Sequence, residues 1–184
     1  MRTDCARNII LIGMPGAGKS TVGVLLAKRL GYHFVDTDLL LQTEQGCRLQ
    51  EIITRVGLDA FKMLEADQLC RLDVSHAVVA TGGSAIYSAR AMDHLRTLGQ
   101  RVFIDIPLPE LLGRVNDMDS RGLVIGPGES YEELYAERFP LYRRYAEITI
   151  AGDGLTVEAV AAAIEERVCG IPPTGRLPDP REQR

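Results

Sequence analysis

The chain has 184 residues, of which 46% are hydrophobic and 25% are charged, and its net charge is −4. This length suits one domain with a full-sized core, and this composition is typical of an ordinary globular protein. The acidic balance argues against a large nucleic-acid-binding surface, and no apolar run approaches the length of a membrane span. We therefore expect no nucleic-acid and no membrane partner, and a monomer by default.

The four cysteines are scattered along the chain, without a C-x-x-C pair or a histidine at metal-ligand spacing. This spacing is typical of reduced thiols. The first apolar run is short and leads straight into a glycine-rich loop, so it does not read as a signal peptide. A cytoplasmic location is expected.

The glycine-rich loop at 13–21 follows an apolar run at 8–12 and precedes a stretch with helical spacing at 22–30, so it lies between a strand and a helix. Its glycines can adopt positive φ, which lets backbone N–H groups point at a polyanion beside the helix N-terminus. Lys19 would bridge the β- and γ-phosphates of ATP, and the Ser20 hydroxyl would complete the coordination of Mg²⁺. The nucleotide-binding residues expected here are Gly13, Gly16, Ala17, Gly18, Lys19, Ser20 and Thr21. The alternative is a glycine-rich turn without a ligand.

A short strand at 34–36 ends in Asp36-Thr37-Asp38. The carboxyl ends of parallel strands form the ligand edge of an α/β sheet. In an extended segment Asp36 and Asp38 would project to the same side, since they are two residues apart. One carboxylate could hold the Mg²⁺ shell while the other accepts the proton of an attacking hydroxyl. The alternative is a helix N-cap followed by a solvated acid.

Three helices are expected next, at 39–44, 49–56 and 58–74. A minimal crossover between strands needs fewer, so residues 37–74 are interpreted as a helical subdomain that closes over a second substrate. The strand expected at 77–80 then runs into Thr81-Gly82-Gly83-Ser84. Gly82 and Gly83 would let a ligand approach the backbone, although a tight turn would use the same residues.

Helices at 88–98, 109–118, 131–145 and 156–168 and strands at 101–105 and 148–150 complete the pattern. This alternation predicts an α/β fold with a parallel, doubly wound sheet. The polar, glycine-containing stretch at 117–130 predicts a mobile lid, whose Arg121 could fold over the transferring phosphate. Residues 171–184 are expected to be a disordered tail, which leaves one domain at 1–170.

Taken in order, these motifs resemble those of the shikimate kinases, small enzymes of the nucleoside-monophosphate-kinase-like class. The resemblance spans residues 8–168 and also includes the 57–65 segment and Arg138-Phe139-Pro140-Leu141-Tyr142. It implies a three-layer P-loop kinase fold with a five-stranded parallel sheet and helices on both faces. It also implies transfer of the γ-phosphoryl group of ATP to a ring hydroxyl of shikimate, giving shikimate 3-phosphate.

For the donor side, the resemblance implies that Lys19, Ser20 and Asp36 manage the phosphates and Mg²⁺. Arg114 would lie against adenine, and Arg121 would be the lid arginine. Donor binding and phosphoryl transfer would therefore use residues from the loop, the second strand and the lid.

For the acceptor side, the resemblance implies that Asp38 binds the acceptor hydroxyls and acts as the base. Gly82 and Gly83 would present their backbone to the acceptor, and Arg138 would hold its carboxylate. Lys62 occupies a further acceptor-side position.

This chain departs from the family pattern at the acceptor end. The usual Gly-Glu-x-x-Phe-Arg reads Gly57-Leu58-Asp59-Ala60-Phe61-Lys62, the third glycine of Gly-Gly-Gly is Ser84, and Gly122 stands where proline is usual. Lysine lacks the planar fork that grips a carboxylate. The alternatives are therefore a related kinase for another hydroxy acid, cyclitol or sugar, and a nucleotide-binding regulatory protein without catalysis.

Overall fold

The computed structural model describes residues 7–116 and 128–170, and the structural statements below concern those residues. Five parallel strands form one sheet in the order β2-β3-β1-β4-β5. They are β1 (Asn8–Ile12), β2 (His33–Asp36), β3 (Ala77–Ala80), β4 (Gly99–Asp105) and β5 (Ile148–Ala151). The expected α/β fold with a five-stranded parallel sheet is confirmed.

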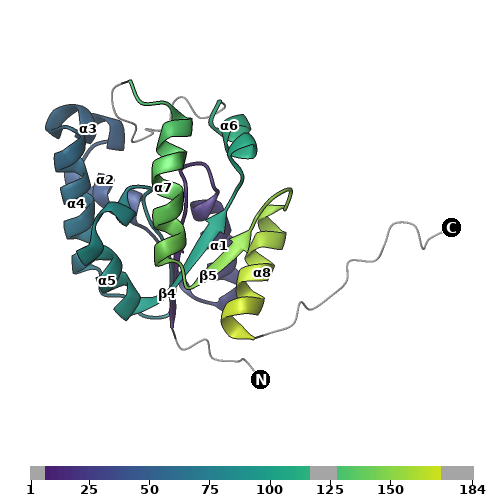
Figure 1. The fold of residues 1–184 in the computed structure, drawn as a ribbon. Coiled ribbons are helices and arrows are strands. Elements are labelled where there is room, and N and C mark those ends of the chain that lie inside the picture. Colours follow the sequence, from purple (N-terminus) through teal and green to yellow (C-terminus); the bar gives the residue numbers. More distant parts are fainter. Residues whose placement is uncertain (1–6, 117–127, 171–184) are drawn as a thin grey trace.

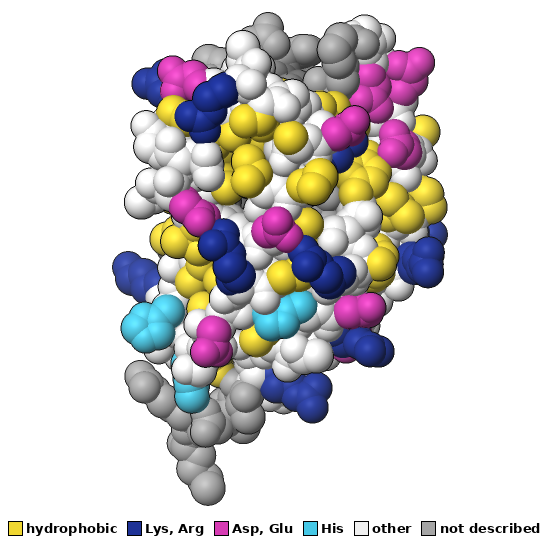
Figure 2. Space-filling view, turned by 90° about the vertical axis from the view of Figure 1, so that its left-hand side faces the viewer, with side chains coloured by type: hydrophobic (Ala, Val, Ile, Leu, Met, Phe, Trp, Pro, Cys, Tyr) yellow, Lys and Arg dark blue, Asp and Glu magenta, His cyan; other side chains and the backbone are white. Residues whose placement is uncertain are grey.

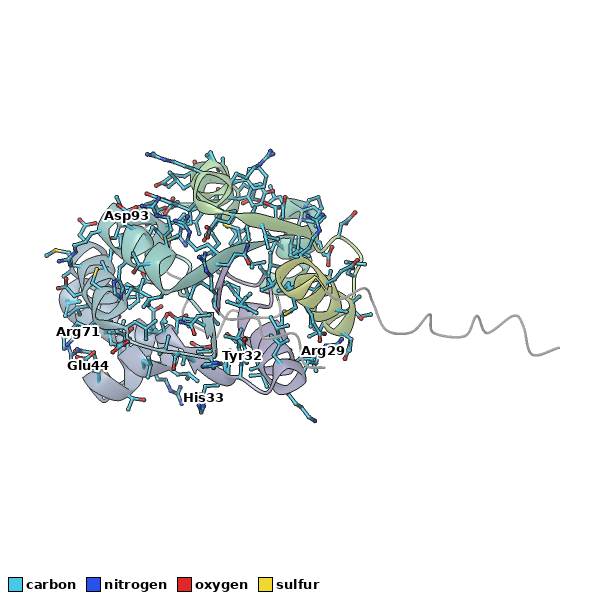
Figure 3. All side chains as sticks on the ribbon, turned by 90° about the horizontal axis from the view of Figure 1, so that it is seen from below. Arg29, Tyr32, His33, Glu44, Arg71 and Asp93 are labelled. Atoms are coloured by element: carbon cyan, nitrogen blue, oxygen red, sulfur yellow. The ribbon has the colours of Figure 1, made fainter. Side chains whose placement is uncertain are left out.

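Helices cover both faces of this sheet (Figures 1 and 3), with α5 and α7 on one face and α1 and α8 on the other. The helices α2, α3 and α4 lie together at the side of the molecule opposite α8 (Figure 1). The described helices are α1 (Lys19–Leu30), α2 (Thr37–Gln45), α3 (Leu49–Val56), α4 (Leu58–Arg71), the 3-10 helix η1 (Ala85–Tyr87), α5 (Ala89–Leu98), α6 (Leu108–Asn116), α7 (Tyr131–Tyr145) and α8 (Val157–Cys169).

Most of the expected elements are present, with differences at their ends. The helix expected to reach residue 74 ends at Arg71, because Leu72 adopts an extended conformation. The 3-10 helix η1 after the glycine turn was not expected. Residues 117–127 of the expected lid and the expected tail at 171–184 lie outside the described residues. The substrate-binding role of α2, α3 and α4 stays a prediction.

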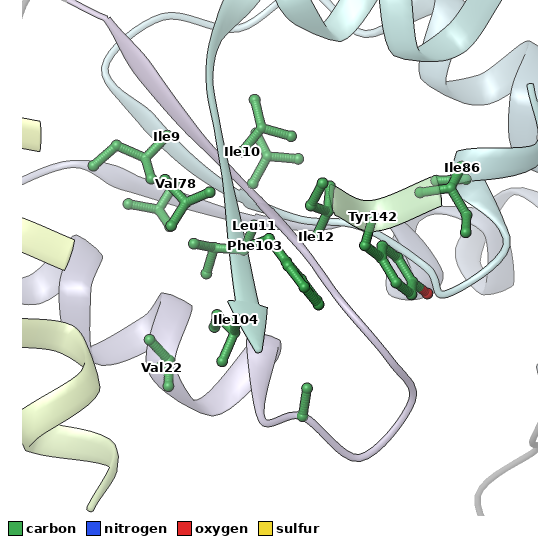
Figure 4. Packing of buried hydrophobic residues seen from close by; sticks show 14 of the residues in the cluster. Ile9, Ile10, Leu11, Ile12, Val22, Val78, Ile86, Phe103, Ile104 and Tyr142 are labelled. Carbon is green, nitrogen blue, oxygen red and sulfur yellow. The ribbon is translucent and has the colours of Figure 1, made fainter. Parts of the chain in front are cut away.

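The main core lies around β1, the central strand, whose apolar side chains are all fully buried. A strand covered by helices on both faces reads as a continuous apolar run, as residues 9–12 do. The ring of Phe103 on β4 stacks on Tyr142 of α7 with 5.3 Å between the ring centroids (Figure 4). This aromatic pair fixes α7 against the sheet.

A second, smaller core joins α2, α3 and α4. It consists of Leu41, Leu49, Ile52 and Phe61, and it is separate from the main core. An ion pair of 2.9 Å between Glu44 and Arg71 adds an exposed link between α2 and α4 (Figure 3). Hydrophobic burial therefore contributes most of the packing among these three helices, since exposed ion pairs contribute little.

Asn8 connects three chain segments at the edge of the sheet where the strands begin. Its Nδ2 donates to the carbonyl oxygens of Val74 (2.7 Å) and Leu98 (3.0 Å), and its Oδ1 accepts from the Ala77 N–H (3.0 Å). The side chain therefore satisfies backbone groups next to β3 and β4 that the strand ladders do not pair.

Two of the cysteines in the described part of the chain, Cys47 and Cys70, are free thiols, as expected. Cys169 is disulfide-bonded, so the expectation of reduced thiols is wrong for this residue. Among the helices of residues 7–116 and 128–170, none has the length and apolar character needed to cross a membrane.

We predict that Asn8→Ala lowers the free energy of unfolding by about 3 kcal/mol, because it leaves three buried backbone groups without partners. Urea unfolding followed by circular dichroism measures this change. Thr54→Ala is the control, since it removes an exposed hydroxyl that only bonds within α3, and we expect it to cost less than about 0.5 kcal/mol. Equal stability of the Asn8 variant and the wild type would contradict the prediction.

Candidate phosphoryl-transfer site

The loop between β1 and α1 has the conformation that the sequence predicts. Gly13, Gly16 and Gly18 have φ values of 151°, 82° and 88°, which residues with a Cβ rarely adopt. Lys19 Nζ donates to the carbonyl oxygens of Gly13 (2.7 Å) and Met14 (3.0 Å), so the loop wraps around the ammonium group. Burial lowers the pKa of Lys19 to about 8. The other loop residues expected to contact nucleotide, Ala17 and Thr21, lie at this turn and on the first turn of α1.

Asp36 connects this loop to the second strand. Its Oδ2 accepts a hydrogen bond of 2.7 Å from the Ser20 hydroxyl. Its Oδ1 accepts from the N–H groups of Asp38 and Leu39, so Asp36 is the N-cap of α2. The expectation of an extended Asp36-Thr37-Asp38 segment is therefore wrong, because the cap starts the helix at Thr37. The N-cap alternative is correct for Asp36.

Asp38 is not the solvated acid of that alternative. It lies on the first turn of α2 and is half-buried, and loss of hydration raises its pKa to about 6. The ammonium of Lys19 opposes this effect by favouring the carboxylate. Asp38 therefore lies beside the phosphate loop with a pKa close to neutral pH.

The second glycine turn lies against the same carboxylate. The Gly82 N–H donates to the Thr37 hydroxyl (3.2 Å), which ties the turn to the start of α2. A Cβ on Gly82 would overlap the carboxyl oxygens of Glu65 and Asp38. Only glycine leaves room for both carboxyl groups here, so this position needs its small residue for close approach rather than for positive φ.

Arg138 lies on α7 with only 1% of its surface exposed. Its Nε donates to the Tyr87 hydroxyl (3.0 Å), and its guanidinium lies over the Tyr87 ring at 5.2 Å. A Cβ on Gly83 would come within 3.0 Å of Arg138 Nη1, so the guanidinium lies directly against the glycine turn. The cation expected to hold an acceptor carboxylate is thus brought to the same place as Asp38.

Two tyrosines hold α7 in position. Tyr131 donates its hydroxyl to the Pro15 carbonyl in the phosphate loop (2.6 Å), and Tyr142 donates to the Gly83 carbonyl in the glycine turn (2.6 Å). The helix therefore contacts both the expected donor side and the expected acceptor side.

Glu65 is a site residue that the sequence reasoning did not single out. It is 2% exposed, its Oε2 accepts a hydrogen bond from the Ser84 hydroxyl, and its Oε1 has no hydrogen-bond partner among the described residues. Burial and the nearby Asp38 raise its pKa to about 7. The available signal was its helical spacing with Phe61 and Leu69, which places an acid on the buried face of α4.

Lys62 and Arg114 lie at opposite sides of the site. Lys62 Nζ lies 4.6 Å from the centre of the Tyr87 ring and lines a cavity of about 310 Å³ between α4 and η1. Arg114 donates to the Gly16 carbonyl (3.4 Å) and pairs with Glu110, so it lies at the phosphate loop. Contact of Arg114 with adenine stays a prediction.

Three further arginines are not part of this site as described. Arg121 lies outside the described residues. Arg143 and Arg144 lie on the exposed side of α7, over the rings of Phe139 and Tyr145. On the face of the molecule drawn in Figure 2, charges of both signs alternate with hydrophobic side chains, without a broad basic patch.

The side-chain oxygens of Ser20 and Asp36 suit a hard cation that is also coordinated by a bound phosphate. A hydroxyl and a carboxylate oxygen are ligands that Mg²⁺ accepts. Within residues 7–116 and 128–170 there is no group of three or more His, Cys, Asp and Glu that could hold a metal ion. A cation here would therefore take further oxygens from a bound phosphate and from water.

Comparisons with known proteins agree with this geometry. The family model described as shikimate kinase matches residues 15–169. A shikimate kinase of Rhodococcus jostii is 38% identical over 153 residues, which are 81% of this chain and 90% of the relative. The solved structure of shikimate kinase from Acinetobacter baumannii in complex with shikimate has a TM-score of 0.81 and 32% identity. It covers 90% of this chain and 94% of that one.

We predict that Glu65→Gln makes stability less sensitive to pH. The folded-state pKa of about 7 lies above the ordinary value of 4.5, so the stability that protonated Glu65 contributes is complete below pH 4.5 and is lost as pH rises through 7. Between these pH values the free energy of unfolding of the variant should therefore rise relative to that of the wild type, by roughly 3 kcal/mol at most.

Urea unfolding at several pH values from 5 to 8 measures this gain. Glu166→Gln, which changes an exposed residue of α8, is the matched control and should show no such trend. Parallel stability curves for the Glu65 variant and the wild type would show that Glu65 does not titrate as described.

Proposed function

The chain belongs to the shikimate kinase family, and from this premise we propose that it transfers the γ-phosphoryl group of ATP to a ring hydroxyl of shikimate, giving shikimate 3-phosphate. The observation that carries this proposal is the convergence of Asp38 and Arg138 on the Gly82-Gly83 turn, next to Lys19. Three groups thus lie around one point. The carboxylate of Asp38 can bind a hydroxyl, the guanidinium of Arg138 can bind a carboxylate, and the ammonium of Lys19 can bind a phosphate.

The phosphate loop and α1 would bind the donor. Backbone N–H groups of Gly16 and Gly18 and the α1 N-terminus favour an anion, and Lys19 would exchange its two carbonyl contacts for phosphate oxygens. Ser20 and Asp36 would hold Mg²⁺, which neutralises phosphate charge when bound. Arg114 would support the adenine, and Arg121 would neutralise charge on the transferring group.

Asp38 would act as the base. The acceptor hydroxyl gives its proton to the Asp38 carboxylate, its oxygen forms the new bond to the γ-phosphorus, and the bond to the β-phosphate oxygen breaks to release ADP. A pKa of about 6 leaves most Asp38 side chains ionised at neutral pH, yet basic enough to accept a proton. Burial of the site also keeps water away from the γ-phosphate.

The acceptor would lie between the glycine turn and α7. Arg138 can pair with its carboxylate, and the Gly82-Gly83 turn, which lies against Asp38 and Arg138, would present its backbone to the acceptor. Lys62 adds a second positive charge, but as a point charge without a planar fork. Because Lys62 and Ser84 stand where the family pattern has arginine and glycine, a hydroxy acid, cyclitol or sugar other than shikimate is the second candidate acceptor.

A regulatory protein that only binds nucleotide is a poorer candidate. Asp38 is held half-buried at a cost in hydration, and nucleotide binding alone gives no reason for that cost. A cytoplasmic location, where ATP is the phosphoryl donor, and a monomeric state are part of the proposal.

We expect the purified protein, supplied with ATP and Mg²⁺, to form ADP with shikimate and to do so at least tenfold faster than with other hydroxy acids, cyclitols or sugars at equal concentration. A coupled assay of ADP release over this acceptor panel measures the rates. Faster turnover of another polyol would replace shikimate as the acceptor while leaving phosphoryl transfer in place. No acceptor-dependent turnover at all would favour the regulatory alternative.

We predict that Asp38→Asn lowers kcat with shikimate by about 10²-fold or more, because the amide cannot accept the hydroxyl proton. The KM for ATP should change little, since the phosphate loop is intact. Asp93→Asn, on the exposed side of α5, is the matched control and should keep the wild-type rate. Wild-type turnover by the Asp38 variant would remove Asp38 from the role of base.

A further inference from the structure

Ser84 joins the glycine turn to α4 through a buried hydrogen bond. Its side chain is 3% exposed, and its hydroxyl donates to Oε2 of Glu65. This link exists because the turn ends in serine, since a glycine at this position would have no donor for Glu65. The orientation of the Glu65 carboxyl group therefore depends on one side chain of the turn.

The second oxygen of that carboxyl group faces the acceptor side of the site. Glu65 Oε1 is buried and has no hydrogen-bond partner among the described residues. It lies against Gly82, as does Asp38 Oδ1, because a Cβ on Gly82 would overlap both oxygens. A buried acceptor without a donor is costly, and a bound hydroxyl would supply the missing donor.

Charged and titratable groups face Glu65 from several elements. The groups are Lys19 on α1, Asp38 on α2, and Arg138 and Tyr142 on α7, in addition to Ser84. The two cations favour the ionised carboxyl group, whereas burial and Asp38 disfavour it. The Ser84 hydrogen bond also favours the ionised form.

We propose that Ser84 is a positioning residue for the acceptor, holding Glu65 so that its free carboxyl oxygen accepts a hydrogen bond from a hydroxyl of the bound acceptor. This proposal rests on the proposed function, because it needs a polyhydroxylated acceptor at the Gly82-Gly83 turn. Ser84 does not touch the acceptor itself in this arrangement. It fixes one hydroxyl contact beside the carboxylate that takes the proton.

The consequence for pH follows from the hydrogen bond. Without the Ser84 hydroxyl, the ionised form of Glu65 loses a donor, so its pKa rises further. A smaller fraction of the protein then has an ionised Glu65 at neutral pH. Acceptor binding should therefore weaken. As pH falls, binding should be lost at a higher pH in the variant than in the wild type.

The test compares Ser84→Ala, Glu65→Gln and the double variant with the wild type, from pH 5.5 to 9. We expect Ser84→Ala to raise the KM for shikimate about tenfold at pH 7, with the KM for ATP changed less than twofold. The acidic limb of kcat/KM for shikimate should move up by roughly half a pH unit to one unit. In the Glu65→Gln background, the same Ser84 substitution should leave that limb in place.

Two further variants separate positioning from loss of structure. Ser84→Thr keeps the hydroxyl and should restore the wild-type pH limb, whereas Ser84→Gly should behave like Ser84→Ala. Thr156→Ala also removes a hydroxyl with a hydrogen bond, at the N-cap of α8, and should lower stability without moving the KM for shikimate. Thermal unfolding of every variant shows whether it is folded under the conditions of the kinetic assay.

An unchanged KM and pH limb in Ser84→Ala would overturn the proposal. A shift of equal size in the Glu65→Gln background would also overturn it, because Ser84 would then act without Glu65. Failure of the proposed function has a different signature, since the wild-type protein itself would not turn over shikimate.

Discussion

The site depends on mutual compensation among charges that the fold removes from water. Lys19, Asp38, Glu65 and Arg138 come from four different helices and meet where β1, β2 and β3 end. Each of these groups alone would be expensive to bury, and two cations with two carboxyl groups offset much of that expense. The arrangement of α1, α2, α4 and α7 is therefore constrained by electrostatics as well as by hydrophobic packing.

Backbone geometry makes this meeting possible. Parallel strands bring their carboxyl ends to one edge, and the turns after β1 and β3 at that edge each contain a position that requires glycine. Gly13 needs its positive φ, whereas Gly82 needs space for two carboxyl groups. At the opposite edge, Asn8 completes the backbone hydrogen bonding of neighbouring strands. Stability and chemistry are thus supported at different ends of the same sheet.

Local patterns predicted most of the fold and the donor side, because strand, helix and phosphate-loop signals lie within short windows. The Asp36-Thr37-Asp38 geometry could not be obtained in this way, since capping of α2 by Asp36 competes with an extended chain. The role of Glu65 was missed for another reason. Its contact with Ser84 joins residues 19 positions apart and arises only when α4 packs against the glycine turn.

The two tyrosine contacts of α7 have a consequence for the coupling between the two ligand sites. Tyr131 reaches the phosphate loop and Tyr142 reaches the glycine turn, so one helix contacts both substrate sites. A displacement of the loop by a nucleotide would therefore act on a helix that also contacts the turn, with Pro140 lying between the two tyrosine contacts. Linkage then requires reciprocity: whatever the first ligand does to the affinity for the second, the second does equally to the first. If the two ligands are coupled at all, this helix is a direct physical connection between their sites within a single domain.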